Sequence, residues 1–186
     1  MSAHRLNPIA LALLTCLLGC DSRPKAPVLR DAPVYENDAE GFRFLVPKGW
    51  IQTASAVLPP ERLEGEVVLV TYRMRTSEKT ALVEVLCFDR ENVDLQQYHA
   101  EPSHGVADWR IVSPLSQRTI HGMPAEHCLY RGTIEKEVIC KEVYAFRRGA
   151  RVYSFIAFYW ESDQNAREEV RQAMESIVWR HLTPSA

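Results

Sequence analysis

The segment Arg151–Trp160 constrains the fold more than any other stretch of the chain, because it is apolar on both of its faces. Successive side chains of a strand point to opposite sides. One side carries Val152, Ile156, Phe158 and Trp160, and the other carries Tyr153, Phe155, Ala157 and Tyr159. Residues 137–147 show the same two-faced pattern, and Arg148-Gly149-Ala150 between the two segments is typical of a tight hairpin turn. Since such strands have to be covered on both sides, we expect an antiparallel hairpin inside a covered sheet.

Shorter patterns predict further strands and two helices. Strands are expected over residues 42–46, 66–75, 80–88, 117–120 and 125–131. A short helix is expected over residues 92–100, with Asp94 near its start. A second helix is expected after Ser162 or Asp163, either of which can cap it, and its apolar side chains form one stripe. The fold class predicted is therefore α+β, an antiparallel sheet with helical or loop layers on both faces (an αβα sandwich).

The amino terminus has the features of an export signal. A positive start at Arg5 precedes the apolar run PIALALLTCLL, which is too short to span a membrane as a helix of about 20 residues. The run ends in LLGC, which resembles the lipobox of bacterial lipoproteins, in which the cysteine is acylated and becomes the first residue. We therefore predict a signal peptide over residues 1–19 and a lipid anchor, such as palmitate, on Cys20. The alternative is a plain signal peptide in which Cys20 stands by chance.

The anchor defines the expected domain organisation. Residues 20–38 contain three prolines and many charges, which is typical of a tether, and residues 39–182 are expected to form a single domain. The protein would then lie outside the cytoplasm, on the periplasmic side or the cell surface, with the membrane as one partner. Lys and Arg total 22 against 24 Asp and Glu, and the basic residues are scattered, so nothing favours binding to nucleic acid.

Three motifs resemble the PsbP/DcrB-like family. They are GFRFLVPKGW at residues 41–50, GMPA at residues 122–125, and SIVW at residues 176–179 behind an aromatic strand and a helix. The resemblance extends from Gly41 to Arg180. It implies an αβα sandwich around an antiparallel sheet and a non-enzymatic role, since most members are extracytoplasmic lipoproteins, photosystem subunits or proteins of unknown role. The motifs are structural in that family, so the resemblance implies no site residue.

Cysteines outside the signal suggest one crosslink. If the hairpin before residue 147 turns about Ile134, Cys128 and Cys140 are equally far from the turn and lie opposite each other, within reach of a disulfide. An extracytoplasmic location permits the bond. A slip of one residue would send the two thiols to opposite faces, and the alternative is therefore two buried free thiols. Cys87 lies in an apolar strand and is expected to be inert.

Motifs for catalysis are weak, which favours a binding or assembly module of the cell envelope with no catalytic residue, cofactor or metal. The sequence has no G-x-S-x-G elbow and no phosphate-binding glycine loop. His127 and Cys128 are adjacent in a strand and point to opposite faces. The alternative is an enzymatic or metal-dependent envelope stress protein that uses His99, His104 and Asp108, with His121 and His127 nearby. The partner, whether an envelope protein or a small ligand, is not identified by the sequence.

Overall fold

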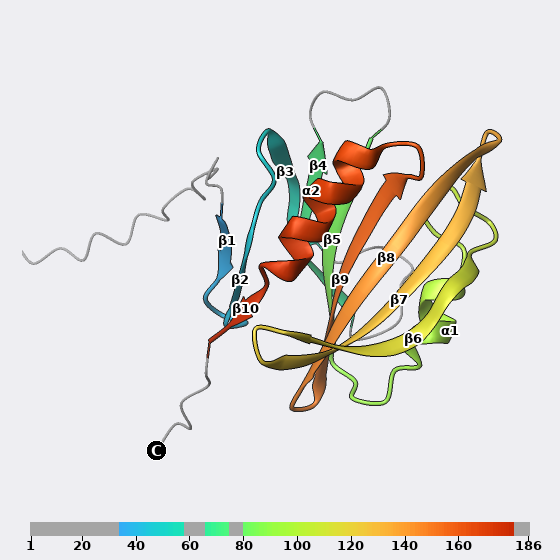
Figure 1. The fold of residues 1–186 in the computed structure, drawn as a ribbon. Coiled ribbons are helices and arrows are strands. Elements are labelled where there is room, and N and C mark those ends of the chain that lie inside the picture. Colours follow the sequence, from blue (N-terminus) through green and yellow to red (C-terminus); the bar gives the residue numbers. More distant parts are fainter. Residues whose placement is uncertain (1–33, 58–65, 75–79, 181–186) are drawn as a thin grey trace, which may run out of the picture. The chain divides into compact units, whose positions relative to one another are not determined.

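The computed structural model describes residues 34–57, 66–74 and 80–180 (Figure 1). Two helices are found in this part of the chain, α1 (Leu95–Ala100) and α2 (Gln164–Glu175). The first strands are β1 (Val34–Asn37), β2 (Phe42–Leu45), β3 (Trp50–Val57), β4 (Glu66–Met74) and β5 (Leu82–Phe88). The later strands are β6 (Arg110–Ile120), β7 (Met123–Ile134), β8 (Glu137–Arg148), β9 (Arg151–Trp160) and β10 (Val178–Trp179).

The strands form two sheets. Seven of them pair antiparallel in the order β3-β4-β5-β9-β8-β7-β6, and three form a small antiparallel sheet in the order β1-β2-β10. This confirms the predicted α+β class with antiparallel pairing. The β8–β9 hairpin also forms as predicted, because Arg148 pairs with Arg151 across a two-residue loop in which Gly149 has a φ of 60°.

Strand β9 lies in the middle of the large sheet and is buried on both faces. Its odd-numbered side chains Tyr153, Phe155, Ala157 and Tyr159 join one apolar cluster, and Val152, Ile156 and Phe158 join the other. The first cluster also contains side chains of α2, β2 and β10, and the second contains side chains of α1 and the segment that follows it. The two-faced pattern of this strand therefore predicted its burial correctly.

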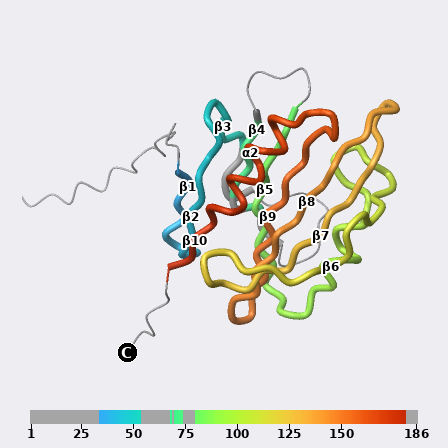
Figure 2. The backbone as a smooth tube through the Cα atoms, viewed as in Figure 1, coloured from blue at the N-terminus to red at the C-terminus, as the bar shows by residue number. Residues whose placement is uncertain are grey.

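The small sheet explains the aromatic motif near the amino end of the domain. The rings of Phe42 and Phe44 pack against Phe155 of β9, at centroid distances of 5.1 and 6.0 Å, and Trp179 of β10 lies 5.2 Å from Phe42. Figure 2 shows β1 and β10 beside β2, the central strand of the small sheet. The alternating Phe-x-Phe pattern therefore directs two rings into the core from a single short strand.

The domain begins earlier than predicted. Residues 34–37 were expected to belong to the tether, but they form β1 and pair with β2 from Val34↔Leu45 to Asn37↔Phe42. Tyr35 from this strand packs against the core. A four-residue strand with one partly buried ring carries too short an alternation to be read from sequence.

Helix α1 and the segment 101–109 contribute side chains to the second apolar cluster. Helix α1 begins at Leu95, three residues later than predicted, and Asp94 lies at its start as expected: the Asp94 carboxylate accepts a hydrogen bond of 3.0 Å from the Gln97 amide. Gly132 of β7 permits close packing here: a Cβ at this position would lie 2.3 Å from Val106 Cγ1. Trp109, beside it, is buried.

Strand β6 is longer than the predicted 117–120. It starts at Arg110, lies at the edge of the large sheet, and contains register shifts between Ile111 and Ser113 and between Ser113 and Ser116. Most of its side chains are exposed, so its sequence lacks the regular alternation of a half-buried strand. Pro124 lies in β7, where it pairs with Thr119 of β6.

Candidate ligand-binding site

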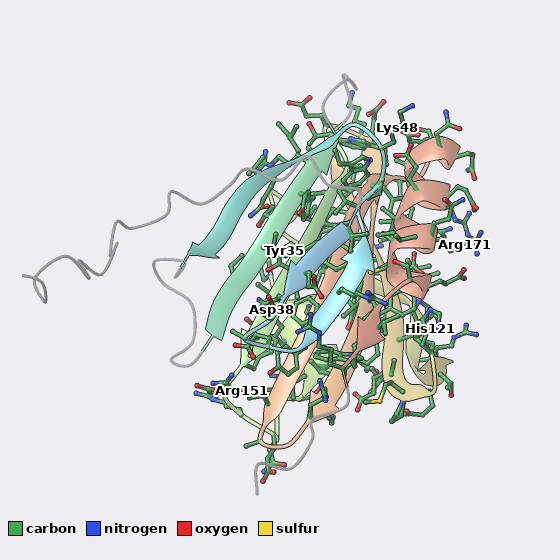
Figure 3. All side chains as sticks on the ribbon, turned by 90° about the vertical axis from the view of Figure 1, so that its left-hand side faces the viewer. Tyr35, Asp38, Lys48, His121, Arg151 and Arg171 are labelled. Carbon is green, nitrogen blue, oxygen red and sulfur yellow. The ribbon has the colours of Figure 1, made fainter. Side chains whose placement is uncertain are left out.

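A cavity of about 720 Å³ lies between α2 and strands β6, β7 and β8. Its size is typical of small-molecule sites. Strands β7 and β8 each contribute two alternate residues, which share one face of the strand, and the end of β6 contributes three consecutive ones. Helix α2 contributes the side chains that flank its buried stripe. Figure 3 shows Arg171 of α2 and His121 of the β6–β7 turn on the same side of the molecule. The cavity is therefore bordered by one helix and one curved edge of the sheet.

Glu142 of β8 is the centre of the polar network in this cavity. Its Oε1 accepts hydrogen bonds from His127 Nε2 (2.9 Å) and from the Tyr144 hydroxyl (3.1 Å), and its Oε2 accepts one from the Tyr159 hydroxyl (3.0 Å). Because a carboxylate only accepts, the His127 ring donates from Nε2. The His127 ring also lies 4.6 Å from that of Tyr144, its direct neighbour across the β7–β8 pair.

The network keeps Glu142 ionised. Burial alone raises the pKa of this carboxyl, but the hydrogen bond and electrostatic attraction of His127, together with the hydrogen bonds from Tyr159 and Tyr144, outweigh it, so the pKa lies below its ordinary value. Burial and the Glu142 charge both raise the pKa of Tyr144 and of Tyr159, so the two hydroxyls stay protonated as donors. We call Glu142, His127, Tyr144 and Tyr159 the floor quartet.

Helix α2 presents a row of charges on its side of the cavity. Arg171 donates to Glu168 at 2.5 Å and to Glu175 at 2.6 Å, one turn away in each direction. These pairs are exposed, and exposed pairs of this kind stabilise a helix only slightly. They do fix the Arg171 guanidinium between two carboxylates, so it is already neutralised within its own helix.

Two other arginines at the cavity are different. Arg118 of β6 and Arg167 of α2 line it, and their guanidinium groups have no hydrogen bond or ion pair within residues 34–57, 66–74 and 80–180. Both are exposed. The Arg118 charge partly offsets the rise in the pKa of Tyr144, and the Arg167 charge does the same for Tyr159. Each guanidinium therefore lies within electrostatic range of one floor tyrosine.

A second buried polar group lies on the opposite face of the sheet, and its contacts are structural. Lys141 of β8 donates to the His99 carbonyl (2.7 Å) and to the Ser103 hydroxyl (3.0 Å), and its ammonium lies 4.3 Å from the Trp109 ring. The lysine thereby fastens the end of α1 and the following segment to the sheet.

The three residues proposed for the alternative metal site contact different partners. His99 is buried against the Ser154 hydroxyl at 3.3 Å, His104 lies 4.0 Å from Glu84, and exposed Asp108 pairs with Arg110 at 2.9 Å. Among the residues that the structure describes, no group of three or more His, Cys, Asp or Glu side chains is arranged to hold a metal ion. The structure does not assemble the site that the alternative required.

The predicted disulfide was wrong. Cys87, Cys128 and Cys140 are buried free thiols. The β7–β8 hairpin turns at Glu135-Lys136, so Cys128 pairs with Val143 and Cys140 pairs with Arg131. This register differs by three residues from the one expected for a turn at Ile134, and an odd shift places the two thiols on opposite faces.

Cys20 and the signal segment lie outside the described residues. The tether prediction overlaps the described part only at its end, where β1 replaces it. In the part of the chain that the structure describes, no helix is both long and apolar enough to cross a membrane.

The floor quartet escaped prediction from the sequence, although His127 was considered for other roles. His127 and Tyr159 lie 15 and 17 residues from Glu142, each across one hairpin, so only the correct register brings these residues together. A signal did exist: Glu142, Tyr144 and Tyr159 are polar positions in strands that are otherwise apolar on both faces. Buried polar side chains in such strands require partners.

Comparison with known proteins adds little. No protein-family model and no curated protein matches the chain. Among solved structures, the chain is similar to a Bacteroides thetaiotaomicron VPI-5482 protein, with a TM-score of 0.48 and 9% identity over 81% of this chain. The chain covers 49% of that protein's length. This likeness is too distant for a conclusion about fold or function.

Proposed function

We propose that the protein is a lipid-anchored, extracytoplasmic binding module of the cell envelope, and that it binds a small polar solute in the cavity between α2 and β6–β8. The cavity carries the proposal: a carboxylate that accepts three hydrogen bonds lies at its floor, and two exposed arginines without ion pairs in the described chain lie at its border. LLGC at the end of a short apolar run supports the anchor on Cys20.

A binding role suits the chemistry of the floor better than a catalytic one. The hydrogen bonds of the floor quartet hold Glu142 ionised, so it is poorly suited to take up and release protons near neutral pH. Burial raises the pKa of all three described thiols, which makes them weak nucleophiles. We therefore propose a non-catalytic role.

The same proposal includes the finer fold, an αβα sandwich of the PsbP/DcrB-like kind. Supporting it, α2 and the small sheet supply side chains to one apolar cluster, and α1 supplies them to the other. The Phe, Trp and Gly positions of the motif GFRFLVPKGW also fit: Phe42, Phe44 and Trp50 are buried, and Gly41 and Gly49 have positive φ.

A pair of bulky substitutions tests the binding site. Thr119 is exposed and lines the cavity, whereas Thr133 is equally exposed on β7 and does not line it. The intact lipoprotein and its Thr119→Trp and Thr133→Trp variants would be incubated with a small-molecule extract of the source envelope and examined by native mass spectrometry. We expect a bound solute on the wild type and on Thr133→Trp, and its loss from Thr119→Trp. Equal binding by all three proteins, or no bound solute on any, would refute the cavity as the binding site.

A further inference from the structure

We propose that the ligand of this cavity is a zwitterion, with its ammonium group at Glu142 and its oxyanion group between Arg118 and Arg167. This inference rests on the proposed function, since it names the chemical class of the solute that the cavity binds. It follows from two sets of charged groups that line the cavity: the Glu142 carboxylate at the floor, and the Arg118 and Arg167 guanidinium groups, which have no ion pair in the described chain, where β6 and α2 border it.

The floor can accept one further hydrogen bond. A carboxylate has about four acceptor positions, and three protein donors reach Glu142, two at Oε1 and one at Oε2. The Tyr144 and Tyr159 hydroxyls use their hydrogens on Glu142, so their oxygens also offer only acceptor positions. A floor of acceptors and tyrosine rings favours a cation with N–H donors, both through hydrogen bonds and through contact with the ring faces.

The border of the cavity offers donors instead. Arg118 and Arg167 come from two different elements and have no carboxylate partner in the described chain, whereas Arg171 is held by Glu168 and Glu175. Guanidinium groups bind carboxylates and phosphates through paired N–H donors. The two arginines are therefore the groups available for an oxyanion.

Only a ligand with both signs of charge satisfies the two ends together. A simple anion small enough to reach the floor would meet the Glu142 charge there. A simple cation would lie near two guanidinium groups without a partner for them. Like charges brought together at a binding site disfavour the wrong ligand, so this arrangement selects for a molecule that carries an ammonium and an oxyanion.

Matched probes test this by calorimetry on the intact lipoprotein in a nonionic detergent. The zwitterions O-phosphoethanolamine and γ-aminobutyrate would be compared with single-charge partners of similar size: ethyl phosphate and ethylamine for the first, butyrate and propylamine for the second. We expect at least one zwitterion to bind about tenfold or more tightly than both of its partners, because each charge-assisted contact contributes to affinity.

Three variants locate the oxyanion end. Arg118→Gln and Arg167→Gln should each reduce the affinity for the zwitterion about tenfold while leaving the affinity for the amine unchanged. Arg110→Gln is the matched control, because Arg110 also lies on β6 and is exposed but pairs with Asp108 and does not line the cavity. All three positions are on the surface, so the variants should fold even if substitution of Glu142 disturbs the core.

The outcomes separate this inference from the proposed function. If every zwitterion fails to bind, or binds no more tightly than its single-charge partners, the proposal of a zwitterionic ligand is refuted, while a solute lost from Thr119→Trp would still support the cavity as a binding site.

Micelles doped with phosphatidylethanolamine distinguish two sources of the same chemistry. Competition with bound O-phosphoethanolamine indicates a lipid headgroup, and no competition indicates a free solute.

Discussion

Glu142 shows at the scale of single residues how one partly buried charge can be held in an apolar face. Three donors from β7, β8 and β9 converge on it, and two of them, His127 and Tyr159, are 15 and 17 residues away in the sequence. Desolvation of an isolated carboxylate would be costly, but three hydrogen bonds compensate for it. The hydrogen bonds of Glu142 therefore require the correct register of both the β7–β8 and the β8–β9 hairpins. Their presence indicates that both hairpins have formed.

The pH dependence of stability should reveal this residue. Because the folded-state pKa of Glu142 lies below its ordinary value of 4.5, its contribution is complete above that value and is lost as the pH falls through the folded-state pKa. We expect the free energy of unfolding to decrease between about pH 5 and about pH 2 more steeply in the wild type than in Glu142→Gln. Urea titrations across this pH range would measure the free energy of unfolding. Glu101→Gln is the control, because it removes an exposed carboxylate. Parallel curves for the wild type and Glu142→Gln would contradict the role assigned to Glu142.

The described thiols should remain unpaired even in an oxidising compartment. Burial raises the pKa of Cys87 and of Cys128 to about 11 and also raises that of Cys140. We expect all three to resist iodoacetamide in the native protein and to react fully in urea, because the thiolate is the reactive form. Non-reducing peptide mapping makes the second check. A linked peptide containing Cys128 and Cys140 would contradict the β7–β8 register.

At the scale of elements, sequence predicted the central strands well and the edge poorly. Strand β9 carries apolar residues on both faces, and it lies buried in the middle of the seven-stranded sheet. Strand β6 is an edge strand with irregular register and mostly exposed side chains, so no burial pattern marks its first half. The β7–β8 turn was misplaced because Glu135 and Lys136 adopt positive φ without the Gly or Asn that usually signals such a turn. The candidate site was missed for the same reason, since its members meet only in the correct register.

The packing of residues 101–109 on β7 depends on Gly132. An added Cβ would lie 2.3 Å from Val106 Cγ1 and 3.1 Å from the Trp109 ring, so one of them has to move. We expect Gly132→Ala to lower the free energy of unfolding by about 1–3 kcal/mol, as overpacking does. Val106→Ala should lower it on its own account through lost burial. The double variant should be more stable than the sum of the two effects, and strict additivity in chemical denaturation would contradict this contact.

At the scale of the whole molecule, one small sheet joins both ends of the described chain. Strands β1 and β10 flank β2, and Arg180 donates its amide to the Gly41 carbonyl at 2.9 Å. The ion pairs of Arg151 with Glu40 (3.0 Å) and Asp89 (2.7 Å) tie the β1–β2 turn to the β8–β9 hairpin and the end of β5. The family resemblance of the sequence predicted that residues near both ends of the described chain belong to one domain. It did not predict that these two ends share a sheet.

Removal of the anchor should change where the protein is found. Several acyl chains on Cys20 would hold the protein in a membrane, whereas a single chain binds only reversibly. We expect Cys20→Ser either to move the protein from the membrane fraction to the soluble fraction or to leave its signal uncut. Fractionation and intact-mass analysis would distinguish these cases. A wild-type protein with a free, unmodified amino terminus would contradict the anchor.

The position of β1 has a mechanical consequence if the protein is held at Cys20. A pull on the chain ahead of Val34 acts at the open end of the β1–β2 hairpin, where Val34 faces Leu45, and separates the residue pairs one after another. Four released residues would lengthen the linkage by about 13 Å at about 3.3 Å each. The β1–β2 pair is therefore the first contact of the domain to bear such a pull.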